Sequence, residues 1–204
     1  MWRTKQENGI TYSGLGNEIE KTASLLDILG ITKGDKVALI GENMPGWGIA
    51  FLSILGVGAV AVPILPDFHE NEVQNIIEHS ESKMLIASSR QISRLKNIIS
   101  GKMPVIITDT LTPLGAEAEE PTGIPIRFTL ESMDKESVED NLATIIYTSG
   151  TTGSSKGVML THKNLAWMAK QCLTVQHVEA GDRFLSILPM SHTYENSIGF
   201  LLPL

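Results

Sequence analysis

Hydrophobic and polar positions along the first half of the chain follow two different periods. Apolar residues recur at helical spacing in four segments: 17–29, 45–55, 70–79 and 90–99. Short apolar runs bounded by turn residues predict four strands, at 36–41, 59–62, 84–87 and 105–108. Strands that alternate with helices of about ten residues are typical of parallel βαβ units. The pattern therefore predicts an α/β fold with a mostly parallel, doubly wound sheet and flanking helices.

The second half continues this pattern. β-branched and aromatic residues predict further strands at 143–148, 157–161 and 184–188, and Thr161 is placed to cap a helix over 162–171. An uncharged stretch at 49–65 is interrupted by Gly56, Gly58 and Pro63, so it indicates a buried helix and strand rather than a membrane span. The chain stops at 202–204 while still apolar, which predicts that the natural protein continues.

Charge is concentrated in one segment of the 204-residue chain, whose formal net charge is −7. Residues 109–142 hold nine acidic residues against Arg127 and Lys135, so this segment accounts for the whole imbalance. Its prolines and glycines indicate a solvated connection, although a partner-binding acidic segment is an alternative. The expected organisation is a first α/β subdomain at 1–108, an acidic linker at 109–142 and a phosphate-loop half at 143–204.

Composition also excludes several classes of function. Outside the acidic segment the charges balance, and nucleic-acid binding needs a concentrated basic surface, so no nucleic-acid partner is expected. The single cysteine, Cys172, excludes an intrachain disulfide and a thiolate metal cluster.

A loop between the strands predicted at 143–148 and 157–161 carries the clearest chemistry. In the ten residues from Thr148 to Gly157, every residue except Lys156 is Gly, Ser or Thr. Glycines let backbone amides turn toward an anion, hydroxyls add short donors, and the lysine neutralises phosphate charge. It is not the ordinary P-loop, because Ser155 precedes the lysine and a strand follows it. The residues indicate a polyphosphate cradle, and a plain Ser/Gly-rich hairpin loop is the alternative.

Sixteen consecutive residues around this loop, Tyr147-Thr-Ser-Gly-Thr-Thr-Gly-Ser-Ser-Lys-Gly-Val-Met-Leu-Thr-His162, resemble the AMP-binding signature of the adenylate-forming enzymes. The family more often has Pro at the position of Ser155. Upstream segments also resemble the family: Ile10–Tyr12, 29–37, 42–47 and 58–63. The resemblance covers nearly the whole chain and implies that the predicted sheet is part of the family's large N-terminal domain.

A second motif, Leu188-Pro-Met-Ser-His-Thr-Tyr-Glu195, resembles the corresponding stretch of long-chain fatty acyl-CoA synthetases. The resemblance implies that His192 lies near the carboxylate to be activated and Glu195 near the phosphates and metal, as the two catalytic residues. From the residues alone, a histidine followed three positions later by glutamate is more often the start of a helix.

The resemblance implies chemistry in two steps. A fatty carboxylate attacks the α-phosphate of ATP to give an acyl-adenylate and pyrophosphate, and the thiol of CoA then displaces AMP. The implied ATP-binding residues are Thr148, Ser149, Gly150, Thr151, Thr152, Gly153, Ser154 and Lys156. Thr151 and Glu195 are implied as ligands of Mg²⁺. The expected small-molecule partners are therefore ATP with Mg²⁺, the fatty acid, and CoA as the second substrate.

Family segments expected further downstream do not occur in these 204 residues: a Tyr-Gly-x-Thr-Glu motif, a Thr-Gly-Asp motif and the lysine of a C-terminal lid. We therefore expect an N-terminal portion of a longer ligase, inactive by itself and completed by the C-terminal remainder. Alternatives are adenylation of an aryl or amino acid, transfer to a carrier protein instead of CoA, and a non-catalytic nucleotide- or phosphate-binding module. The expected location is cytoplasmic, with at most peripheral membrane contact.

Overall fold

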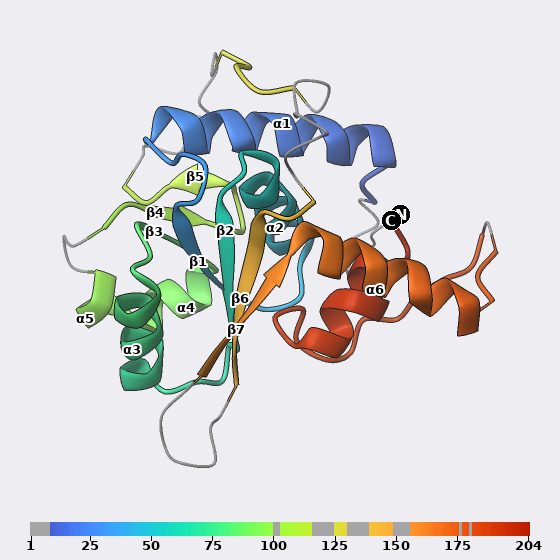
Figure 1. Ribbon diagram of the computed structural model, residues 1–204. Helices are drawn as coiled ribbons and strands as arrows, with labels where there is room; N and C mark the ends of the chain where they lie inside the picture. Colours follow the sequence, from blue (N-terminus) through green and yellow to red (C-terminus); the bar gives the residue numbers. More distant parts are fainter. Residues whose placement is uncertain are drawn as a thin grey trace.

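A single mixed sheet organises the protein (Figure 1). The computed structural model describes residues 9–99, 103–115, 125–129, 139–148, 156–175, 177–179 and 181–204. The seven strands of this part are β1 (Lys36–Ile40), β2 (Val60–Ile64), β3 (Met84–Ala87), β4 (Val105–Ile107), β5 (Thr112–Pro113), β6 (Leu142–Thr148) and β7 (Lys156–Thr161). Their order is β5-β4-β3-β1-β2-β6-β7. The five inner strands are parallel, and β5 and β7 pair antiparallel at the two edges.

Helices cover both faces of the sheet. They are α1 (Tyr12–Ile28), α2 (Pro45–Gly56), α3 (Glu70–Ser80), α4 (Ser89–Arg94), α5 (Lys96–Ile99), α6 (His162–Val175) and the π-helix η2 (Glu195–Leu201). Alternate residues of β1 face opposite layers: Val37 and Leu39 pack with α1, α2 and η2, whereas Ala38 and Ile40 pack with α3 and α4. Because both faces are covered, the inner strands are apolar throughout, as parallel strands are. The predicted doubly wound α/β fold is confirmed.

Two predicted elements differ from the structure. The helix expected over 90–99 is divided at Leu95 into α4 and α5. The strand expected at 184–188 is wrong, because residues 182–187 have no regular secondary structure. Leu185 and Ile187 are 80% and 75% exposed, so this segment gains neither strand partners nor burial from the sheet. An apolar run predicts a strand only where a neighbouring strand is available to pair with it.

Parts of the acidic segment are structured. Strand β5 lies within it, and residues 125–129 lie against α1, where the Ser24 hydroxyl oxygen accepts hydrogen bonds from the amides of Arg127 and Phe128 at 3.1 and 3.2 Å. Strands from both sides of the segment join the same sheet, since β6 pairs with β2. Residues 116–124 and 130–138 lie outside the described residues, so the linker and the three-part division remain predictions. None of the described helices combines the length and the hydropathy that a membrane span requires.

Candidate functional site

The signature loop closes the β6–β7 hairpin. Thr148 and Lys156 are register partners at the mouth of the loop, and both are exposed. A Cβ atom on Gly157 would lie 2.8 Å from Ile145 Cγ2 and 3.3 Å from Tyr147 Cζ, so only glycine fits here without a shift in its neighbours. The remaining predicted phosphate-binding residues, from Ser149 to Ser154, lie outside the described residues, as does Ser155. The structure therefore places the two ends of the loop, on facing strands.

Tyr147 anchors the strand that leads into the loop. Its hydroxyl lies 2.7 Å from His79 Nδ1 on α3, and the two rings meet edge to face with centroids 5.7 Å apart. Burial raises the pKa of the Tyr147 hydroxyl, so the group stays protonated and able to donate. This contact fixes the end of β6 against α3, one residue before the loop begins.

Lys156 carries the positive charge of the site. Among the described residues, no carboxylate lies within ion-pair distance of its ammonium group. An exposed lysine that does not already neutralise a carboxylate remains free to interact with an anionic ligand. The arrangement suits a phosphate placed at the mouth of the loop.

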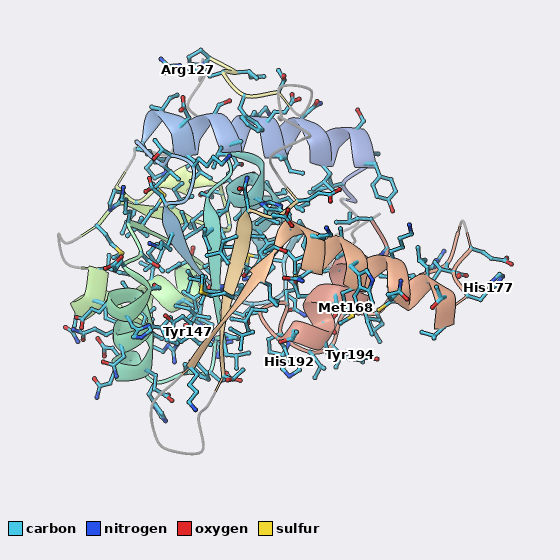
Figure 2. All side chains as sticks on the ribbon, in the orientation of Figure 1. Arg127, Tyr147, Met168, His177, His192 and Tyr194 are labelled. Carbon is cyan, nitrogen blue, oxygen red and sulfur yellow. The ribbon has the colours of Figure 1, made fainter. Side chains whose placement is uncertain are left out.

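His192 lies at the start of the helical segment that contains η2 (Figure 2). Its Nδ1 accepts a hydrogen bond from the Tyr194 amide at 3.2 Å, and its carbonyl oxygen accepts one from the Asn196 amide at 2.9 Å. Because Nδ1 acts as an acceptor, the neutral ring carries its proton on Nε2. The exposed ring can therefore donate from Nε2 to a carboxylate. The helix start expected from the residues alone is present as well.

Glu195 is buried, with only 5% of its surface exposed. Its Oε2 accepts a hydrogen bond from the Leu188 amide at 3.3 Å, and its Oε1 has no hydrogen-bond partner among the described residues. A Cβ atom on Gly199 would overlap the Glu195 carboxylate, so a side chain at this position would displace the carboxylate from the place it has here. The carboxylate lies inside a π-helix, a rare form that is frequent at functional sites. A buried oxygen without a partner is the kind of atom that a cation or a donor from a ligand would satisfy.

A cavity of about 300 Å³ lies between the β6–β7 hairpin, α6 and η2. Its lining is mostly apolar and consists of Ile146, Leu160, Asn164, Leu165, Trp167, Met168, Thr193, Asn196 and Ser197. Trp167 and Met168 are exposed at its border. Such a cavity favours a hydrocarbon group over a charged one. A larger open hollow of about 770 Å³ near the starts of α1 and α2 contains none of the predicted site residues.

Topology brings the two predicted halves of the site to one edge of the sheet. Strands β1, β2 and β6 are parallel, so they end at the same edge, called here the carboxyl edge. Thr148 ends β6 at this edge, and Asn43, which follows β1 there, bonds the segment that precedes His192. The carboxyl edge is where open α/β sheets bind ligands.

Sequence reasoning missed Asn43 and Gly199. Asn43 stood within a segment that resembled the family, whereas nothing local singled out Gly199.

His162, the last residue of the signature, lies at the opposite end of β7 from the loop and is half-buried. Burial lowers the pKa of its imidazole below the ordinary value, so the folded protein binds this proton less readily than the unfolded chain. The free energy of unfolding should therefore fall as the pH drops from about 7.5 through the ordinary histidine pKa.

The His162→Gln variant removes this titration. We expect its loss of stability between pH 7.5 and 5.5 to be smaller than that of the wild type, measured by urea unfolding at each pH. Parallel losses in the two proteins would contradict the assignment. The lowered pKa of Glu42 acts in a separate window, below the ordinary glutamate pKa, and does not interfere.

Comparison with known proteins finds relatives that match nearly the whole chain. The chain is 32% identical over 95% of its length to the long-chain-fatty-acid–[acyl-carrier-protein] ligase AEE15 of Arabidopsis thaliana, of which it covers 30%. It is 31% identical over 93% of its length to the long-chain-fatty-acid–CoA ligase FadD15 of Mycobacterium bovis, of which it covers 33%. The chain thus spans about a third of the length of these curated relatives.

A solved structure shows the same fold. The inhibitor-bound N-terminal domain of FACL13 from Mycobacterium tuberculosis superposes with a TM-score of 0.79 at 29% identity, over 95% of this chain and 48% of that one. The family model described as AMP-binding enzyme matches residues 2–204. With the signature on a hairpin at the carboxyl edge and a match over nearly its whole length, the chain belongs to the AMP-binding, adenylate-forming ligases.

Proposed function

We propose that the complete protein activates a long-chain fatty acid with ATP to an acyl-adenylate and then transfers the acyl group to CoA. The observation that carries this proposal is the convergence at the carboxyl edge. The loop ends Thr148 and Lys156 belong to the same edge as the segment that carries His192. Adenylation requires the substrate carboxylate to meet the α-phosphate of ATP. A single edge that carries both the predicted phosphate loop and a histidine able to donate a hydrogen bond to the carboxylate supports that step.

The loop is proposed to bind the β- and γ-phosphates of ATP. Amides and hydroxyls of residues 148–154 would donate to the phosphate oxygens, and Lys156 would neutralise their charge. Magnesium would arrive with ATP and keep mostly phosphate and water ligands, so one or two protein oxygens suffice. Thr151 and Glu195 are proposed for this role. Glu195 is supported by its buried Oε1, which has no hydrogen-bond partner within the described part of the chain.

His192 is proposed to bind the substrate carboxylate through Nε2, because Nδ1 already accepts from the Tyr194 amide. A hydrogen bond from Nε2 would orient one carboxylate oxygen toward the α-phosphate. The cavity between the hairpin, α6 and η2 is proposed to receive the hydrocarbon chain, since most of its lining is apolar.

The test of this function is ATP–pyrophosphate exchange by the complete protein with a panel of carboxylic acids. We expect exchange with long-chain fatty acids and at least tenfold less with amino acids, because the cavity lining is mostly apolar and, among the described residues, includes no charged side chain that could pair with an amino group. Aryl acids belong to the same panel. Reactions without a carboxylate are the control. Preferred exchange with an aryl or amino acid would replace the substrate class, and binding of ATP without any exchange would favour a non-catalytic phosphate-binding module.

The 204-residue chain is proposed to be inactive by itself. It spans about a third of its relatives, and the adenine-pocket and lid motifs of the resemblance do not occur in it. Robust exchange by the 204-residue chain would contradict this proposal.

A carrier-protein thiol is the second candidate acceptor. The relation to AEE15, whose name gives acyl-carrier protein as the acceptor, favours it specifically. The two acceptors are distinguished by supplying the complete protein with either CoA or a phosphopantetheinylated carrier protein and measuring release of AMP.

A further inference from the structure

Asn43 connects two parts of the chain that are more than 140 residues apart. It follows Glu42 just beyond β1, at the carboxyl edge. Its Nδ2 donates to the Ser186 hydroxyl oxygen and to the Leu188 carbonyl oxygen, each at 2.7 Å, and its Oδ1 accepts from the Met190 amide at 2.8 Å. One side chain thus bonds three alternate residues of the irregular segment that precedes His192.

The chemistry of these partners determines the orientation of the amide. A carbonyl oxygen only accepts and a backbone amide only donates, so Leu188 must face Nδ2 and Met190 must face Oδ1. Aspartate would lose both donations, and alanine would lose all three bonds. Of these three side chains, only asparagine can make all three hydrogen bonds.

The three hydrogen bonds of Asn43 hold a segment that side-chain packing stabilises only weakly. Leu185 and Ile187 are largely exposed, so their side chains bury little surface that could hold the segment in place. The segment also lacks strand partners, because residues 182–187 lie outside the sheet. Met190, by contrast with Leu185 and Ile187, is buried. Its amide donates the hydrogen bond that Asn43 Oδ1 accepts.

Further hydrogen bonds lead from this segment to His192. The His192 amide donates to the Pro189 carbonyl oxygen at 2.7 Å, and the Asn196 side chain donates to the Met190 carbonyl oxygen at 3.3 Å. The position of the histidine backbone therefore follows from the position of residues 188–190, which Asn43 bonds directly.

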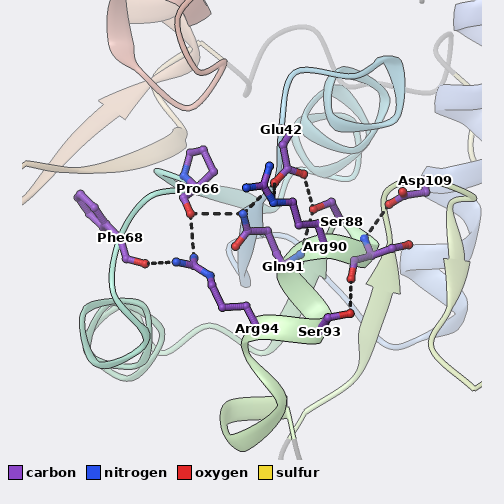
Figure 3. A network of polar contacts seen from close by, with 10 residues as sticks. Glu42, Pro66, Phe68, Ser88, Arg90, Gln91, Ser93, Arg94 and Asp109 are labelled. Atoms are coloured by element: carbon purple, nitrogen blue, oxygen red, sulfur yellow. Dashed lines mark hydrogen bonds and ion pairs between the residues drawn. The ribbon is translucent and has the colours of Figure 1, made fainter.

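The residue before Asn43, Glu42, takes part in a polar network with α4 (Figure 3). The neighbouring Glu42 carboxylate accepts from the Ser88 hydroxyl at 2.6 Å and from Gln91 Nε2 at 2.9 Å, and the Arg90 guanidinium lies 3.8 Å away. Gln91 also donates to the Pro66 carbonyl oxygen at 3.3 Å. Through the Glu42 side chain, this network ties the turn after β1 to α4 and to Pro66, just beyond β2.

We propose that Asn43 is a positioning residue: by bonding Ser186, Leu188 and Met190 it places His192 at the carboxyl edge for binding of the substrate carboxylate. The positioning follows from the contacts, and its consequence for the reaction rests on the proposed function. Asn43 acts through the segment and does not touch the substrate.

The first experiment measures the position directly in the complete protein. In Asn43→Ala, we expect hydrogen exchange at the Met190 amide to speed up at least tenfold, because its acceptor is gone. Ser186→Ala removes one of the three bonds and should cause a smaller change. Asn71→Ala, at an exposed asparagine on α3, is the matched control and should leave Met190 unchanged. Unchanged protection of Met190 in Asn43→Ala would overturn the positioning.

The second experiment measures the consequence for the reaction. Asn43→Ala should lower kcat for fatty-acid-dependent ATP–pyrophosphate exchange about 10- to 100-fold, since a misplacement of about 1 Å can have such an effect. The KM for ATP should stay within about twofold, because the phosphate loop lies on another segment. If Asn43→Ala does not fold, Asn43→Asp takes its place, as it keeps the size of the side chain and the acceptor for Met190.

The outcomes separate the two claims. Faster exchange at Met190 with an unchanged kcat would overturn the role in the reaction, and equal changes in kcat and the KM for ATP would reduce Asn43 to a general structural residue. A wild-type protein without any carboxylate-dependent exchange would overturn the proposed function and the catalytic part of this inference, while the Met190 measurement would still decide the positioning.

Discussion

Gly46→Ala should destabilise the folded protein by about 3 kcal/mol, the upper end of the usual range for overpacking. A Cβ atom at Gly46, in the first turn of α2, would overlap the Thr108 carbonyl oxygen and lie 3.0 Å from its carbonyl carbon. Backbone atoms cannot rotate aside, and Thr108 is held because its amide donates to the Ala87 carbonyl oxygen at 3.0 Å. Either α2 or the end of β4 must move, which disturbs the core around Trp47.

The matched control is Gly56→Ala, at the other end of the same helix. Among the described residues, an added Cβ there would meet only the ring of the half-buried Phe128, at 3.3 Å, and a side chain can adjust where a backbone carbonyl cannot. Alanine also favours helix over glycine by up to about 1 kcal/mol, so this variant should be close to neutral or stabilised. Urea unfolding of both variants measures the difference. A midpoint for Gly46→Ala equal to that of the wild type would show that the contact relaxes without cost.

Lys156→Ala should lower the rate of adenylation by the complete protein about a hundredfold, the size of effect seen when one preorganised charge-stabilising group is removed. Lys156 is exposed at the mouth of the loop and has no ion-pair partner among the described residues, so the substitution should leave the unfolding midpoint unchanged. Lys156→Arg keeps the charge and should retain part of the activity, though not all of it, because the two groups differ in shape.

Lys163→Ala is the control for a general effect of charge. Lys163 is an exposed lysine near the far end of β7, where its ammonium lies 3.9 Å from a Glu139 carboxylate oxygen and 4.0 Å from an Asp140 one. Surface pairs of this kind contribute little to stability, so both activity and folding should persist. An unchanged rate of pyrophosphate exchange in Lys156→Ala would remove the lysine from the phosphate site, whereas a loss shared with Lys163→Ala would indicate a nonspecific cause.

Most elements could be predicted from the sequence because their signals are local. Strand β3 has the predicted bounds, since its four residues are all buried and turn residues flank the run. Thr161 caps α6 as expected, accepting from the Asn164 amide at 3.2 Å, and Gly30 takes a positive φ of 84° just beyond α1. Each of these choices depends on the conformational preference of a few adjacent residues.

The errors occur where a distant partner decides the outcome. The residues at 184–188 have the composition of a strand, but Asn43 holds the segment through side-chain hydrogen bonds and no strand pairs with it. Similarly, nothing local shows that a side chain at position 199 would displace the Glu195 carboxylate, because that contact depends on how the two residues pack in the helix.

The α/β class, the order of the elements in the first half and the chemical character of the loop from Thr148 to Gly157 all follow from signals within the amino-acid sequence. These features depend on periodicity and on residue types at fixed spacing, and both can be read from the order of the residues alone. That the ends of the loop and the His192 segment share one edge of the sheet follows instead from the three-dimensional fold, because strand order and the three hydrogen bonds of Asn43 join residues far apart in the chain. A motif specifies its chemistry locally, whereas its place relative to another motif depends on the packing of the whole sheet.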